Sequence, residues 1–247
     1  MLLFYITIAL LIGSAGSVGL AGILLLLQDE KLNKVSSYLI SLAGGTLLGA
    51  AFLGMLPKAI SFASTEISVF RLVLASIVAF FITEKAILWR ICSNKNCERH
   101  QNASATLILL GDAFHNFIDG IIITTAFFSS YSFGILVTLS VFAHEIPQEL
   151  ADFGVLINNG YSRKKALWYN MLSSLSTLPG GIIAYFALAS AEKLIPWILA
   201  ISAASFIYIA LADLVPQMHK KTRIKDSIIQ IGLIITGIFI IYIIKKI

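Results

Sequence analysis

Carboxylate and imidazole side chains gather in one otherwise apolar part of the sequence. Between Ser104 and Gly160 there is no lysine or arginine, yet this stretch holds five of the 13 acidic residues and two of the four histidines. If the stretch lies in a bilayer, each of these side chains costs roughly 2.5–3.5 kcal/mol to insert, so the group requires a partner. The simplest partner is a cation. The residues are Asp112, His115, Asp119, His144, Glu145, Glu149 and Asp152.

The spacing of the first residues predicts one polar face on a helix. His115 and Asp119 are four residues apart, and Asp112 lies one turn earlier. All three therefore share a face, with Asn116 beside them.

A second helix is predicted to carry two rows of polar side chains. His144 and Gln148 are four residues apart, as are Glu145 and Glu149, and Asp152 extends the second row. The two rows lie side by side on the helix surface.

A short uncharged turn at 129–132 joins the two helices into a hairpin. Counting from this turn at about 1.5 Å per residue puts Asp119 roughly 17 Å deep, and His115, His144 and Glu145 roughly 20–23 Å deep. We expect these four side chains to converge near the middle of the membrane. The residues expected deeper still, as steps of an inward path, are Asp112, Gln148, Glu149 and Asp152.

Pro147 lies among the polar residues of the second helix. It removes one backbone donor and presses on the carbonyl of Ala143, which frees a polar oxygen beside His144. Imidazole, carboxylate and amide ligands without a thiolate suit Zn²⁺, Fe²⁺, Mn²⁺ or Co²⁺ better than Cu⁺. A buried polar network, or a proton relay without metal, is the alternative reading of the same residues.

The elements that must position these residues are predicted to be transmembrane helices. The chain is 58% hydrophobic and 13% charged, against roughly 25% charged residues in a soluble domain. Apolar runs of roughly 20 residues recur along its length. We expect one polytopic domain, 1–247, and we interpret the first run, which lacks a basic leader and a cleavage site, as a span. The eight expected spans are near 2–27, 36–57, 68–90, 104–128, 133–157, 166–190, 195–217 and 227–244.

The distribution of basic residues predicts the orientation. Most lysines and arginines fall in connections 1–2, 3–4, 5–6 and 7–8, including the loop at about 91–103 between spans 3 and 4. The positive-inside rule makes these connections cytoplasmic and places both termini outside. The net charge of +5 is therefore an orientation signal, and it does not imply a nucleic-acid partner.

Spans 2 and 7 resemble each other faintly. "GGTLLGAAFLGMLPK" and "AASFIYIALADLVPQ" both run from paired small residues to a proline. On the expected topology they cross the membrane in opposite directions, as an inverted repeat requires. The pattern favours a transporter in which spans 4 and 5 lie between two halves.

The pair "HNFIDG", His115–Gly120, and "HEIPQE", His144–Glu149, resembles the signature of the Zrt/Irt-like (ZIP) divalent-metal transporters. The resemblance covers the whole chain. It implies eight helices in a 3+2+3 arrangement, a homodimer in the plasma membrane, and elevator-like movement of metal into the cytoplasm. It also implies a lipid-embedded carrier that is not an enzyme and needs no cofactor, with Zn²⁺ as substrate, or another divalent metal such as Fe²⁺, Mn²⁺, Co²⁺ or Cd²⁺.

The resemblance also implies a set of metal ligands. Glu145 falls on the position that bridges two adjacent metal positions in the family. Gln148 stands where many relatives have histidine, which puts the metal preference in question. Span 6 offers hydroxyl and amide groups but no carboxylate within its core. The implied ligands are His115, Asn116, Asp119, His144, Glu145 and Gln148.

Other residues are expected to be accessory. Met55, just before a Leu-Pro pair in span 2, falls near a ligand position of some relatives. Asp213 and His219 near the inner end of span 7 are candidates for metal release, although a solvated helix end is the plainer interpretation of His219. Relatives often carry a metal-binding loop where this chain has Cys92, Cys97 and His100, but the spacing is not a standard zinc pattern.

An intramembrane zinc metalloprotease is the alternative function. "HEIPQ" resembles the His-Glu-x-x-His motif, in which two histidines hold zinc and the glutamate activates water. Here Gln148 replaces the second histidine, and Pro147 distorts the helical spacing that the motif requires. The alternative also leaves "HNFIDG" largely unused.

Overall fold

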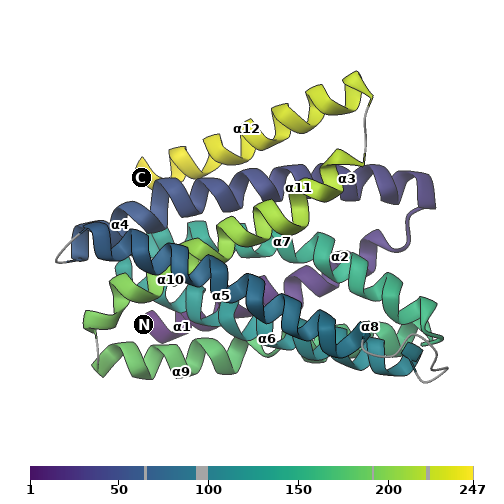
Figure 1. Cartoon of the computed structure of the whole chain (residues 1–247), viewed down its shortest axis with the longest axis horizontal. Helices are drawn as coiled ribbons and strands as arrows, with labels where there is room; N and C mark the ends of the chain where they lie inside the picture. The colour runs from purple at the N-terminus through teal and green to yellow at the C-terminus, as the bar shows by residue number, and fades with distance from the viewer. Residues whose placement is uncertain (64–65, 93–99, 191, 221–222, 247) are drawn as a thin grey trace.

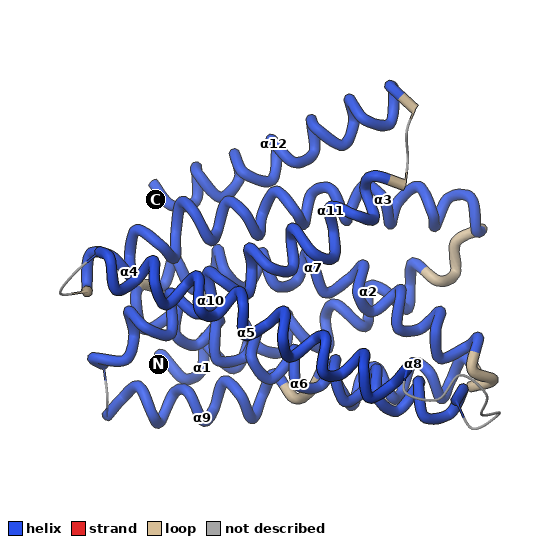
Figure 2. The backbone as a smooth tube through the Cα atoms, viewed as in Figure 1, coloured by secondary structure: helices blue, strands red, loops and turns tan. Residues whose placement is uncertain are grey.

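The computed structural model describes residues 1–63, 66–92, 100–190, 192–220 and 223–246 (Figure 1). Within these ranges the elements are helical, the connections are short and there is no strand (Figure 2). The predicted all-α class is therefore confirmed. Cys97 and most of the expected connection 91–103 lie outside the described residues, as do the side chains of Cys92 and His100.

The first half of the chain forms long helical rods that lie along the bundle. The first rod is α1 (Leu2–Leu11), a π-helical turn η1 (Ile12–Gly16) and α2 (Ser17–Leu24). The second rod is α3 (Asp29–Gly49), a π-helical turn η2 (Ala50–Met55) and α4 (Leu56–Phe62). The helices that follow are α5 (Glu66–Cys92), α6 (His100–Ser129) and α7 (Tyr131–Asn158).

The second half of the chain also consists of helical rods interrupted by short turns. α8 (Arg163–Ser174) and α9 (Thr177–Ser190) follow each other with a break between them, and a 3₁₀ turn, η3 (Glu192–Leu194), leads into the next rod. That rod is α10 (Ile195–Tyr208), a π-helical turn η4 (Ile209–Leu214) and α11 (Val215–His219). The last helix is α12 (Ile224–Lys246).

Six helical stretches in the described part of the chain are long and apolar enough to cross a membrane. α6 and α7 are not among them, although they have 30 and 28 residues, and these are the helices that carry the predicted hairpin of histidines and carboxylates. A polytopic membrane protein is therefore confirmed, whereas eight spans stay a prediction. The six stretches are Leu2–Leu24, Glu30–Phe62, Ile67–Ala86, Arg163–Ala189, Ile195–His219 and Ile224–Ile244.

Both chain ends lie at one end of the bundle (Figure 1). The connections from α2 to α3 and from α7 to α8 lie at the opposite end, as do the end of α11 and the start of α12 (Figure 1). Lys31, Lys34, Arg163 and Lys164 are exposed there. This basic end is the one that the charge pattern predicts to be cytoplasmic.

The two rods that resemble each other in sequence share a backbone irregularity. In η2 the N–H of Leu56 donates to the carbonyl of Ala51, and after η4 the N–H of Val215 donates to the carbonyl of Ala210, both five residues back. A proline stands two residues after the end of each turn, at positions 57 and 216. A proline ring presses on the carbonyl four residues earlier, and a widened turn relieves that contact. The rods also run in opposite directions (Figure 1).

Glycines allow two helix pairs to approach until their backbones touch. A Cβ on Gly120 of α6 would lie 2.0 Å from the carbonyl oxygen of Thr177, and one on Gly180 of α9 would lie 2.1 Å from that of Phe117. α3 and α12 cross in the same way, because a Cβ on Gly45 would lie 2.2 Å from the carbonyl oxygen of Ile234. Small residues at such crossings are typical of membrane helices.

Gly120→Ala should lower the stability of the protein because the new methyl group cannot fit against the α9 backbone. Overpacking of this kind costs about 1–3 kcal/mol. Gly111→Ala on the same helix is the matched control, since a Cβ there meets nothing within 4 Å. Thermal unfolding in detergent should show a lower Tm for Gly120→Ala and an equal or higher Tm for Gly111→Ala. Equal Tm values for the two variants would contradict the crossing.

Candidate metal-binding site

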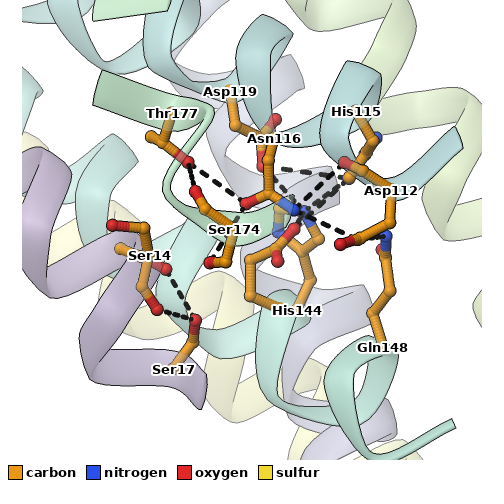
Figure 3. Close-up of polar contacts among 12 residues, drawn as sticks. Ser14, Ser17, Asp112, His115, Asn116, Asp119, His144, Gln148, Ser174 and Thr177 are labelled. Carbon is orange, nitrogen blue, oxygen red and sulfur yellow. Dashed lines mark hydrogen bonds and ion pairs between the residues drawn. The ribbon is translucent and has the colours of Figure 1, made fainter. Parts of the chain in front are cut away.

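Two neighbouring helices bring four ligand side chains to one point. α6 contributes His115 and Asp119, and α7 contributes His144 and Glu145. Figure 3 shows how His115, Asp119 and His144 lie. One ligand atom from each residue lies within 4.8 Å of all the others. The spacing within each helix puts each pair on one face, and the hairpin brings the two faces together.

The distances within this cluster are those of groups that could share one cation. His144 Nε2 is 3.2 Å from a carboxylate oxygen of Asp119 and 3.4 Å from one of Glu145. His115 Nε2 is 3.4 Å from the same Glu145 oxygen and 3.3 Å from His144 Nε2. Asp119 and Glu145 are fully buried, while the side chain of His115 is 21% exposed. His115 is therefore the member of the cluster that solvent or an ion can reach.

The backbone of α7 orients His144. Its Nδ1 lies 3.0 Å from the carbonyl oxygen of Ser140, one turn earlier. A carbonyl can only accept a hydrogen bond, so Nδ1 carries the proton and donates to it. In the neutral ring this leaves the lone pair of Nε2 directed at Asp119 and Glu145, as a metal ligand requires.

The carboxylate oxygens of Asp119 and Glu145 lack hydrogen-bond donors among the described residues. Within the described part of the chain, both oxygens of Asp119 and both of Glu145 are buried and accept no hydrogen bond, and the ion pairs of these groups are with the two histidines. Buried polar atoms normally have a partner. Unsatisfied carboxylate oxygens beside two imidazoles are the donor set that a divalent metal takes.

A second group of carboxylates adjoins the first. Ligand atoms of Asp112, Glu145 and Glu149 lie within 4.8 Å of one another, so Glu145 belongs to both groups. Asp112 and Glu149 are buried, and both oxygens of Glu149 accept no hydrogen bond from the described residues. The Gln148 amide donates to Asp112 Oδ1 at 3.0 Å. In this structure Gln148 therefore orients Asp112.

Asn116 links α6 to the break between α8 and α9 (Figure 3). Its Nδ2 donates to Asp112 Oδ1 at 3.1 Å, and its Oδ1 accepts from Thr177 at 3.1 Å and from Ser174 at 3.5 Å. The Ser176 hydroxyl donates to the carbonyl of Ala113. Asn116 thus holds the polar face of α6 against the hydroxyl groups of the following rod, and its own role as a ligand stays a prediction.

A cavity of about 340 Å³ leads away from the cluster. His115 and His144 line one end, and Asp152, Asp213 and Gln217 line its other walls. The α7 residues of the lining run from His144 to Asp152, which is the direction of the basic end of the bundle (Figure 1). The cavity therefore extends from the cluster toward that end.

The other predicted accessory residues lie outside this cavity. Met55 is fully buried in the hydrophobic core, and a Cβ on the neighbouring Gly54 would lie 2.5 Å from the ring of Phe133. Phe133 precedes His144 by about three helical turns, so Met55 packs on the side of the hairpin turn. His219 is exposed at the end of α11.

One polar pair near the site was missed by the sequence analysis. Glu84 on α5 and Tyr208 on α10 line a second cavity of about 270 Å³, together with His115 and Asp213. The Tyr208 hydroxyl donates to Glu84 across a separation of 124 residues. Spacing within one helix cannot reveal a pair on two helices so far apart in the chain.

Comparison with known proteins gives an independent indication of family. A family profile described as "ZIP Zinc transporter" matches residues 90–245, more than half of the chain. Zinc transporter zipt-7.2 of Caenorhabditis elegans is 36% identical over 152 residues, which are 60% of this chain and 33% of that protein. Human Zinc transporter ZIP4 is 43% identical over 114 residues, which are 46% of this chain and 18% of that protein.

Zinc transporter foi of Drosophila melanogaster is 37% identical over 144 residues, covering 58% of this chain and 20% of that protein. The matched region thus spans a third or less of the length of these relatives. The profile, however, covers both helices of the four-residue cluster and every helix that follows them. On this match the chain belongs to the ZIP zinc transporter family.

Proposed function

We propose that this protein transports a divalent metal, preferentially zinc, into the cytoplasm through the site between α6 and α7. The observation that carries the proposal is the buried cluster of two imidazoles and two unsatisfied carboxylates, His115, Asp119, His144 and Glu145. Two carboxylates match the charge of one divalent ion. The family and the printed names of its relatives, which are zinc transporters, favour zinc as that ion.

Glu145 serves two adjacent metal positions in this proposal. The first is the four-residue cluster, and the second uses Asp112 and Glu149 with Glu145. Gln148 and Asn116 complete the ligand set or orient Asp112, to which both donate. Metal then leaves along Asp152 and Asp213, whose carboxylates bind divalent ions through oxygen alone and so release zinc more readily than imidazole does.

The proposed topology has eight spans, with both termini outside and the basic end of the bundle in the cytoplasm. α6 and α7 supply the two spans beyond the six apolar stretches, because the substrate compensates their polar residues. The chain, 1–247, forms one membrane domain in a 3+2+3 arrangement. The matching π-helical turns before Pro57 and Pro216 support the inverted repeat. We place the protein in the plasma membrane, as the family resemblance implies.

An elevator-like motion is proposed for the crossing. α6 is fixed to α9 by Gly120 and Gly180, α7 packs on α2, and together these helices carry the site. α3 packs on α12 and α10 packs on α5, forming a second body. The two bodies meet where α7 contacts α3 and α10 contacts α6. Sliding there would move the cluster between the two membrane faces. In a homodimer, contact between the two subunits would keep the second body fixed while the first body moves.

No observation favours the metalloprotease alternative. The amide of Gln148 donates to Asp112, and Pro147 lies inside α7. The named relatives are transporters.

Substitutions of the two α7 ligands should abolish transport. Purified protein in liposomes that contain a zinc-sensitive dye should admit Zn²⁺, and His144→Ala or Glu145→Ala should reduce the rate to that of liposomes without protein. Glu30→Ala is the matched control, because Glu30 is exposed on α3, and it should keep the wild-type rate. Zinc entry that both site substitutions leave unchanged would overturn the assignment.

Gln148→His should sharpen the preference for zinc over manganese. The new imidazole adds a ligand that suits Zn²⁺ better than Mn²⁺. Inhibition of zinc uptake by Mn²⁺ should therefore weaken about tenfold, which is the size of effect that substitutions around a metal site have on metal affinity. Gln217→His introduces the same side chain elsewhere in the cavity and should leave the competition unaltered. The same shift in both variants, or none in either, would argue against a position for Gln148 beside the metal.

A further inference from the structure

A groove between α2 and α8 lies at the basic end of the bundle, apart from the metal cluster. Its volume is about 370 Å³. Leu25 and Leu26 line it from the turn that follows α2, Leu167 from α8 and Leu32 from α3. Gly22 sets its width, because a Cβ there would lie 3.2 Å from the Leu167 side chain. The groove is thus apolar along most of its length.

Two basic side chains stand at one end of this groove. Arg163 and Lys164 begin α8, and both are exposed. Neither forms an ion pair in the described part of the chain, and no carboxylate is among the described residues that line the groove. Two uncompensated positive charges beside an apolar groove complement a ligand with an anionic head and an apolar tail.

The surroundings identify this ligand as a membrane lipid. Leu26 is 82% exposed, and Trp168, which follows Leu167, is 63% exposed. Large apolar side chains with this exposure face hydrocarbon in a membrane protein, and tryptophan is enriched where the hydrocarbon meets the headgroups. Basic pockets between helices on the cytoplasmic side bind anionic headgroups. A soluble anion would use the two charges but not the leucines.

We propose that the groove between α2 and α8 binds an anionic phospholipid of the cytoplasmic leaflet. Its phosphate lies at Arg163 and Lys164, and one acyl chain lies along Leu25, Leu26 and Leu167. The assignment to that leaflet rests on the proposed function, in which the basic end of the bundle is cytoplasmic. The binding of the lipid to the groove does not depend on that orientation.

Native mass spectrometry of the purified chain in detergent tests the groove with phosphatidylglycerol and phosphatidylcholine of identical acyl chains. Phosphatidylglycerol should bind and phosphatidylcholine should not. Each basic residue near an anionic lipid contributes about a fivefold factor in affinity, so Arg163→Gln/Lys164→Gln should weaken binding roughly thirtyfold. Lys220→Gln/Arg223→Gln removes the same two residue types at the same end and should leave binding intact. Leu26→Gln should weaken binding without a change of charge.

Several results would overturn the proposal. Equal losses of phosphatidylglycerol affinity in the two double variants would mean that the overall positive charge of this end attracts the lipid, without a specific site. Equal binding of phosphatidylglycerol and phosphatidylcholine would mean that the charge of the lipid plays no part. Glycerol phosphate that competes as well as the whole lipid would mean a soluble-anion site. Melting temperatures of all variants establish that they fold. A chain that binds phosphatidylglycerol in this way but carries no zinc would refute the transport function and leave the groove in place.

Discussion

The burial of negatively charged carboxylates is the constraint on which the rest of this structure depends. Asp119 and Glu145 are fully buried, and within the described residues they face the two histidines and no lysine or arginine. Taking a carboxylate out of water costs several kcal/mol, even after relaxation of the protein. The described residues leave that cost only partly offset, and in the proposed function a cation supplies the remaining compensation. This is the electrostatic form of substrate recognition that a metal carrier needs.

The helix packing follows from this constraint. Groups that repel one another stay close only if their helices are fixed by other contacts, and α6 is fixed by the backbone contact of Gly120 and Gly180 and by the Asn116 amide. On α7, the carbonyl of Ser140 sets the His144 ring, and Asn170 donates to the carbonyl of Glu149 at 3.1 Å. A neutral group therefore orients the His144 ring, and another fixes the backbone of α7 at Glu149. Such arrangements keep the orientation whether or not the charges are compensated.

Much of the fold was predictable from the sequence, because helical periodicity and hydropathy act within one segment. Spacing alone predicted that His115, Asp119, His144 and Glu145 would converge, and the structure brings them together. It could not predict that Gln148 and Asn116 would both donate to Asp112, since spacing shows the face of a side chain but not its partner. The pair of Glu84 and Tyr208 depends on tertiary packing, and hydropathy carries no signal for a π-helical turn. Metal ligation by any of these residues stays a prediction.

The paired π-helical turns have a consequence for how the chain arose. Each holds one residue more than an α-helical turn of the same height. Each ends two residues before a proline, in one of two rods that run in opposite directions. The proline ring accounts for this shared distance, because in both rods it presses on the carbonyl four residues earlier and the widened turn relieves that contact. Under the proposed inverted repeat, the two turns would be equivalent positions of one duplicated unit. When the two rods are aligned on their prolines, Asp213 corresponds to Gly54, so the same position lines the cavity in one rod and packs against Phe133 in the other.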